Sequence, residues 1–104
     1  MNSIIKNFCN NYLADKSMIT LEKLINNSET CTNYVDTLDL TDDVKTLVDD
    51  MAKNFFQAMV ILFSIANWEY LPNNDDMDLK QVYEDKISEC INNTYRIAER
   101  IINY

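Results

Sequence analysis

The fold of this chain is decided mainly by residues 41–70, TDDVKTLVDDMAKNFFQAMVILFSIANWEY. Its apolar residues recur three and four positions apart for about six turns, which is the spacing of one face of an α-helix. They are Val44, Leu47, Val48, Met51, Phe55, Ala58, Met59, Leu62, Ile65 and Ala66. Asp42 and Asp43 suit the positive end of the helix dipole. Leu71-Pro72 ends the pattern, because the residue before a proline is driven out of helical geometry. The sequence predicts a long helix from Thr41 or Asp42 to about Tyr70.

A second long amphipathic pattern covers about residues 76–103. Its apolar face consists of Leu79, Val82, Tyr83, Ile87, Cys90, Ile91, Thr94, Ala98, Ile101 and Ile102. Asp75 is expected to cap this helix, with Asp78 in its first turn. Arg96 and Arg100 suit its negative C-terminal end. Because only the turn at residues 73–76 separates the two long helices, we expect them to pair as an antiparallel hairpin.

Two shorter helices are expected before the hairpin. Helical spacing covers residues 3–13, with Ser3 as N-cap, and residues 17–26, with Ser17 as N-cap. The two could also form one bent helix, since neither proline nor glycine separates them. Residues 28–40 are predicted to form a loop with at most one helical turn, because threonine, tyrosine and valine favour extended backbone. The predicted fold is all-α: residues 1–104 form one small bundle of three to four helices, with the long C-terminal hairpin.

The residue types argue against an enzyme. The chain has no glycine and no histidine, which excludes glycine-rich phosphate loops, histidine-based triads and histidine metal ligands. The three cysteines form no CxxC pair, so neither a zinc site nor a disulfide framework is predicted. Cys9 and Cys90 lie on apolar faces, whereas Cys31 is the candidate for exposure. The pairs Asn26-Asn27 and Asn73-Asn74 are expected to take the place of glycine at helix ends. We expect no catalytic residue, no metal and no cofactor.

The chain is strongly acidic. Seventeen acidic against nine basic residues give a net charge of −8, which repels nucleic acid and anionic membranes and attracts basic surfaces. We therefore expect a protein partner with a basic surface, and neither direct nucleic-acid binding nor membrane binding. The candidate binding residues are Asp42, Asp43, Asp49, Asp50, Asp75, Asp76, Asp78, Glu84 and Asp85. In a hairpin, Asp75, Asp76 and Asp78 lie at one end, and Asp42 and Asp43 lie near the other. The alternative is that these carboxylates only cap helices and keep the chain soluble.

The run at residues 55–66 is apolar on nearly every side of its helix. Either the other helices surround it, or one face with Phe56, Val60 and Phe63 forms an oligomer interface. Trp68 either closes the end of the bundle or joins that interface, since tryptophan suits both positions. A homodimer is therefore possible.

The N-terminal residues lack the basic start and long apolar run of a signal peptide, so a cytoplasmic location, in the host cell if the protein is viral, is expected. The richness in Asn, Ile, Asp and Tyr is typical of AT-rich genomes, including those of many phages and large viruses. In composition the chain is similar to small acidic helical inhibitors and immunity proteins. Our first hypothesis is a non-enzymatic protein that binds and inhibits or neutralises another protein, such as a phage anti-defence inhibitor or an immunity protein. The second is an assembly module: a homodimeric bundle or a subunit of a larger complex.

Overall fold

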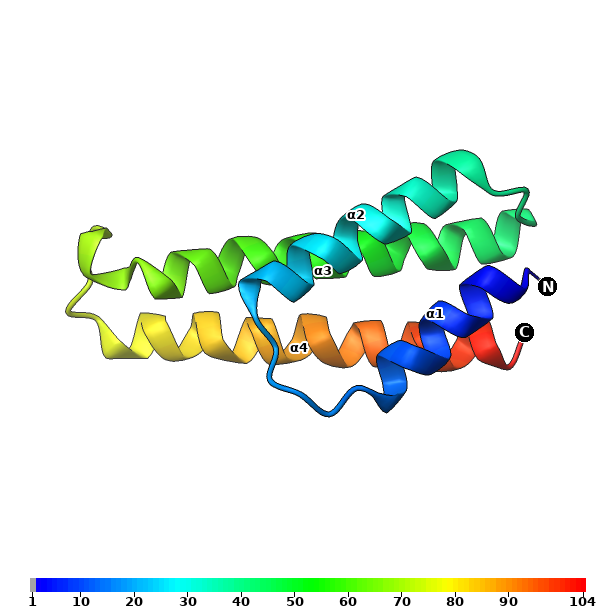
Figure 1. Cartoon of the computed structure of the whole chain (residues 1–104). Helices are drawn as coiled ribbons and strands as arrows, with labels where there is room; N and C mark the ends of the chain where they lie inside the picture. The colour runs from blue at the N-terminus through cyan, green and yellow to red at the C-terminus, as the bar shows by residue number, and fades with distance from the viewer. Residues whose placement is uncertain (1) are drawn as a thin grey trace.

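The computed structural model describes residues 2–104, and in that range the chain is helical apart from turns and connecting segments. In order along the chain, the elements are α1 (Ser3–Ala14), α2 (Leu21–Thr37), α3 (Asp42–Ala66), the short 3-10 helix η1 (Trp68–Tyr70) and α4 (Met77–Ile102). Helices α3 and α4 lie side by side and run in opposite directions, with α2 packed on α3 and α1 on α4 (Figure 1). The prediction of an all-α helical bundle is confirmed. The bundle is elongated, at 48 × 24 × 20 Å.

Each α-helix starts at a side-chain oxygen that accepts a backbone N–H of the first turn. These N-caps are Asn2, Thr20, Thr41 and Asp76. The predicted caps Ser3, Ser17 and Asp75 are wrong. Ser3 is already helical, Asp75 lies one residue too early, and Ser17 lies in the loop before α2. Several oxygen-bearing residues precede each helix, and only the backbone geometry selects the one that reaches the N–H group. Asp78 does lie in the first turn of α4, as predicted.

Two predictions about this part of the chain are wrong: the bounds of the helix at residues 17–26 and the loop at residues 28–40. Helix α2 starts at Leu21 and continues to Thr37 through most of the predicted loop. Leu24, Ser28 and Cys31 lie on one face at positions i, i+4 and i+7, and all three are buried. Ser28 Oγ donates to the Ala52 carbonyl oxygen of α3 at 3.3 Å. This packing overrides the weak helix propensity of the segment. Cys31, expected to be exposed, is only 1 % exposed.

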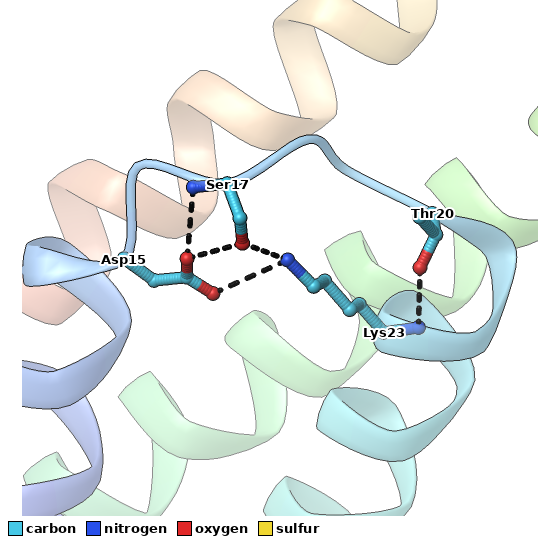
Figure 2. A network of polar contacts seen from close by, with 4 residues as sticks. All are labelled: Asp15, Ser17, Thr20 and Lys23. Carbon is cyan, nitrogen blue, oxygen red and sulfur yellow. Dashed lines mark hydrogen bonds and ion pairs between the residues drawn. The ribbon is translucent and has the colours of Figure 1, made fainter.

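Residues 15–20 separate α1 from α2, so the two do not form one bent helix. The Asp15 carboxylate accepts hydrogen bonds from the backbone N–H and hydroxyl of Ser17, and Lys23 Nζ lies 3.5 Å from Asp15 Oδ2 and also contacts Ser17 Oγ (Figure 2). Thr20 Oγ1 accepts the Lys23 N–H at 3.2 Å. The hydrogen bonds from Ser17, assisted by Lys23, hold the pKa of Asp15 below its ordinary value. The network ties the loop to the first turn of α2.

The turn between the long helices shows how a chain without glycine reverses direction. Helix α3 ends at Ala66, and η1 follows in place of the last predicted helical turn, ahead of Leu71-Pro72. Asn73 has φ 61°, the left-handed conformation that asparagine tolerates best after glycine. The prediction that asparagine replaces glycine is confirmed for the backbone conformation of Asn73, although this residue lies in the turn after η1 and is not a helix C-cap. It is wrong at Asn26-Asn27, which lie inside α2.

The core lies where all four α-helices meet. Tyr12 of α1 places its ring 5.1 Å from that of Phe55 in α3 and 5.0 Å from that of Tyr95 in α4, measured between centroids. Its hydroxyl lies 2.7 Å from Thr94 Oγ1, which is fully buried. The Phe8 and Tyr34 rings meet edge to face and join α1 to α2. Cys9 and Cys90 are buried, as predicted. In the described residues, no helix has the length and apolarity needed to cross a membrane.

Candidate protein-binding surface

The hairpin has a covered half and an open half. Helices α1 and α2 have 12 and 17 residues, whereas α3 and α4 have 25 and 26. The short helices therefore lie along only one end of the hairpin, and the end with the 67–76 turn stands without them (Figure 1). We call residues 59–89 the open half. Trp68 is the one buried residue of that range, whereas buried residues occur throughout 44–58 and 90–101. The open half is two helices with no third layer.

An apolar strip runs from the covered half into the open half along α3. Phe56, Val60 and Phe63 are 55 %, 45 % and 58 % exposed. Their spacing of four and three residues places them on one face of the helix. No charged residue occurs between Lys53 and Glu69. Of the two interpretations of the run at 55–66, the structure supports an exposed face rather than a helix surrounded by the rest of its own chain.

A groove of about 540 Å³ opens between α3 and α4 in the same half. Its lining residues are Val60, Ile61 and Ser64 of α3 and Val82, Tyr83, Asp85, Lys86 and Glu89 of α4. Val60 belongs to both the apolar strip and the groove, so the two features are continuous. Val82 is 59 % exposed although it lies on the apolar face of α4. The groove therefore has apolar side chains from both helices, and Asp85, Lys86 and Glu89 of α4 border them.

Trp68 lies at the end of the bundle and not on the apolar strip. Its indole Nε1–H donates to the Asn74 carbonyl oxygen at 2.7 Å, and its ring meets that of Tyr83 edge to face at 5.4 Å. The side chain amide of Asn74 donates back to the Glu69 carbonyl oxygen at 2.7 Å. Trp68 is 8 % exposed. These contacts support its role in closing the end of the hairpin over a role in an oligomer interface.

The candidate carboxylates lie mostly at the two ends of the hairpin. Asp42 and Asp43 are in the first turn of α3, where the Tyr104 hydroxyl donates to Asp43. Asp75 and Asp76 lie at the opposite end, just before α4, and Asp78 lies in its first turn. Asp76 Oδ1 accepts the Leu79 N–H at 2.9 Å. Asp49 and Asp50 lie along α3, and Glu84 and Asp85 lie along the open half of α4. Within residues 2–104, Asp49 is the one member of these nine that forms an ion pair, with Lys53 at 3.0 Å.

Charge is concentrated in the open half. Seven carboxylates stand there against two lysines, a net charge of −5. They are Glu69, Asp75, Asp76, Asp78, Glu84, Asp85 and Glu89, against Lys80 and Lys86. Lys86 Nζ pairs with Glu89 Oε1 at 3.4 Å, and Gln81 donates to Asp85 at 2.8 Å. Both contacts are exposed, so the carboxylates keep free oxygen positions for a further donor.

The thiols are structural. Cys9, Cys31 and Cys90 are buried and free. Burial raises the pKa of Cys9 to about 11 and that of Cys31 to about 12, and it also raises the pKa of Cys90. Because the thiolate is the reactive form, these thiols are poor nucleophiles at neutral pH. In the part of the chain that the structure describes, no three cysteine or acidic side chains converge in a way that could hold a metal ion.

Sequence reasoning found the apolar strip but missed the groove. Val82 and Tyr83 were predicted to lie on the packed face of α4, and Glu89 was not among the candidate binding residues. One signal in the sequence pointed to the groove: the predicted helices before residue 41 are much shorter than the two that follow, so they cannot cover the hairpin. No model of a known protein family, no curated protein and no solved structure matches this chain.

Proposed function

We propose that this chain is a small non-enzymatic protein that binds a second protein with a basic surface and inhibits or neutralises it. The observation that carries the proposal is the set of exposed carboxylates along a helical body 48 Å long. Among the side chains that the structure describes, only Asp49 of the nine candidates forms an ion pair. Surface carboxylates make the local electrostatic potential negative, and this potential steers a basic partner onto the surface. Rows of carboxylates can also imitate the phosphates of a nucleic acid.

Composition supports a more specific role. The AT-rich residue usage and the net charge of −8 suit a phage or mobile-element protein that blocks a nucleic-acid-handling defence enzyme. They equally suit an immunity protein that neutralises a toxin. In both cases the partner carries lysines and arginines that otherwise contact phosphate, and the acidic surface competes for them.

The experiment is a pull-down from the source organism's lysate with the tagged protein, washed at low and at high salt, followed by mass spectrometry. A basic protein that is retained at low salt and released at high salt supports the proposal, because exposed charges are screened by salt. Absence of a basic protein from the low-salt eluate would refute it.

Charge variants then locate the contact. Two variants each remove two carboxylates: Asp49→Asn/Asp50→Asn and Asp75→Asn/Asp78→Asn. Glu22→Gln/Glu29→Gln on α2 is the matched control, since it removes the same charge from exposed positions outside the candidate set. We expect at least one candidate variant to bind the captured partner about tenfold more weakly than the control. Unchanged affinity in both variants would count against the candidate carboxylates.

The exposed apolar strip favours a second candidate function, an assembly module. Phe56, Val60 and Phe63 together form the kind of exposed apolar surface that marks association sites. Sedimentation equilibrium from low to high protein concentration tests this function. A stable dimer that Phe63→Ser disrupts would support it, whereas a monomer at every concentration would speak against self-assembly.

A further inference from the structure

No third helix of residues 2–104 packs on the open half of the hairpin, in contrast to the covered half. In the covered half, α2 packs on α3 through Leu24, Ser28 and Cys31. Ser28 of α2 and Ala52, Lys53 and Phe56 of α3 line a shared surface hollow, so Phe56 borders the position of α2. From Phe56, the apolar strip continues along α3 toward the hairpin turn. The exposed apolar strip therefore begins beside α2 and continues along α3 into the open half.

The exposed apolar surface has the chemistry of a helix-binding groove. The groove between Val60 and Val82 has a volume of about 540 Å³, within the ordinary range of about 300–1,000 Å³ for binding pockets. Ser64 Oγ donates to the Val60 carbonyl oxygen at 3.0 Å, so its hydroxyl is satisfied inside the helix. The floor of the groove thus offers mainly apolar contacts, which suit the anchor residues of an amphipathic helix.

The negative charge of the open half favours a basic partner over a second copy of this chain. Asp85 and Glu89 line the groove together with Lys86, which pairs with Glu89, and the open half as a whole has a net charge of −5. A second copy of the chain would bring the same excess of carboxylates against them, and like charges across an interface weaken it. A helix with lysines and arginines beside its apolar face would complement both the floor and the acidic rim.

We propose that the open half, residues 59–89, binds one basic amphipathic α-helix of the partner protein. The partner's apolar side chains fill the groove between Val60 and Val82, and its basic side chains pair with Asp85, Glu89 and the carboxylates at the hairpin turn. The part of α4 that lies in the open half, residues 77–89, is about 20 Å long, which matches a partner helix of about three and a half turns. This inference rests on the proposed function for the basic character of the partner.

The test uses the whole chain and three synthetic peptides of about 14 residues. The first peptide has leucines at positions three and four apart and lysines elsewhere. The second replaces the lysines with glutamates, and the third scrambles the first. Binding is measured by isothermal titration calorimetry and mapped by backbone amide NMR shifts. We expect the basic peptide to bind at residues 59–89 and to bind at least about tenfold more tightly than the other two peptides. Equal binding of the scrambled peptide, or shifts outside the open half, would overturn the proposal.

Matched variants separate the groove from general charge attraction. Val60→Ser/Val82→Ser removes two exposed groove contacts, and Ile4→Ser/Met18→Ser removes two exposed apolar side chains elsewhere. We expect the groove variant to lose about tenfold in affinity for the basic peptide and the control to stay within about twofold. Circular dichroism of each variant verifies that the helices are retained. Equal affinity of the groove variant and the control would overturn the docking site.

The same reagents distinguish failure of this inference from failure of the proposed function. A captured partner that binds Val60→Ser/Val82→Ser as tightly as the unchanged chain would leave the proposed function intact and refute the docking site. Binding of the basic peptide at the groove, without a salt-sensitive partner in the lysate, would support the docking site and refute the proposed function. A dimer that forms through the open half would show that a second copy is the occupant, and would refute the basic-helix proposal.

Discussion

The hydrogen bond between Tyr12 and Thr94 tests how α1 is held on the hairpin. Tyr12 Oη and Thr94 Oγ1 are 2.7 Å apart, and Thr94 Oγ1 donates its own proton to the Ile91 carbonyl oxygen at 2.6 Å. Thr94 therefore accepts from Tyr12. Burial, the largest influence, raises the pKa of the Tyr12 phenol, so Tyr12 holds its proton throughout the neutral range. Tyr12→Phe removes this donor and keeps the ring contacts with Phe55 and Tyr95.

The expected loss in free energy of unfolding depends on which polar groups each substitution leaves without a hydrogen-bond partner. Tyr12→Phe deletes one hydrogen bond and leaves Thr94 bonded to Ile91, so the free energy of unfolding should fall by about 1 kcal/mol. Thr94→Val leaves the half-buried phenol without this partner, which costs about 1–3 kcal/mol. The double variant removes both polar groups. Its loss should therefore be smaller than the sum of the two single losses by about 1 kcal/mol.

Urea unfolding followed by far-UV circular dichroism measures the four free energies. Tyr70→Phe is the control, because Tyr70 is 78 % exposed and an exposed hydroxyl should change stability by less than about 0.5 kcal/mol. If the two single losses add to within about 0.3 kcal/mol in the double variant, the two hydroxyls are not coupled. The assignment of Tyr12 as the donor that anchors α1 would then be wrong.

Four further predictions concern the turn, the thiols and the open half. Asn73→Ala should lower the free energy of unfolding by about 1 kcal/mol, because alanine resists the left-handed φ of 61°, whereas Asn73→Gly should stay within about 0.5 kcal/mol. Thermal unfolding checks both, and an alanine variant as stable as the unchanged chain would refute the reasoning. The three cysteines should resist iodoacetamide at pH 8 until urea unfolds the chain, as read by mass spectrometry. Because folding raises the pKa of Cys9 to about 11 and that of Cys31 to about 12, their stabilisation is complete below about pH 8.5 and is lost as pH rises toward 12, by up to about 1.4 kcal/mol per pH unit for each thiol. Urea midpoints at pH 8, 9.5 and 11 should fall in that order, and a flat profile would contradict the pKa shifts. Amides at 59–66 and 77–89 should exchange hydrogen at least about tenfold faster than those beside buried residues of the same helices. Uniform protection along α3 and α4 would show that the open half is as stable as the covered half.

The long helices were predictable because large apolar residues repeat along them with little interruption. The stripe from Val44 to Ala66 predicted the C-terminus of α3 to within about one turn. Helix α2 was only partly predictable, since its buried residues past Leu24 are Ser28 and Cys31, which carry a weak hydrophobic signal. Those small side chains allow close approach to α3, and that contact exists only in the folded bundle.

The candidate surface was also only partly predictable from the sequence. Phe56, Val60 and Phe63 could be proposed as an exposed face from their spacing and from the absence of charge around them. The groove depends on the alignment of Val60 with Val82, residues on two different helices. That alignment follows from the register of the hairpin, to which the turn at Asn73 and the contacts of Trp68 contribute.

By itself, the sequence determined an all-α bundle, a long C-terminal pair of helices, a turn made with asparagine in place of glycine, and a strongly acidic surface. These features depend on local periodicity, local turn chemistry and charge, which the residues carry with them. The tertiary structure decided how far α2 extends, that Cys31 is buried, and which part of the hairpin stays open. Burial depends on which helices lie alongside a given turn, and 12 and 17 residues of covering helix cannot shield a hairpin of 25 and 26. Identical apolar periodicity therefore forms core at one end of α3 and α4 and exposed surface at the other.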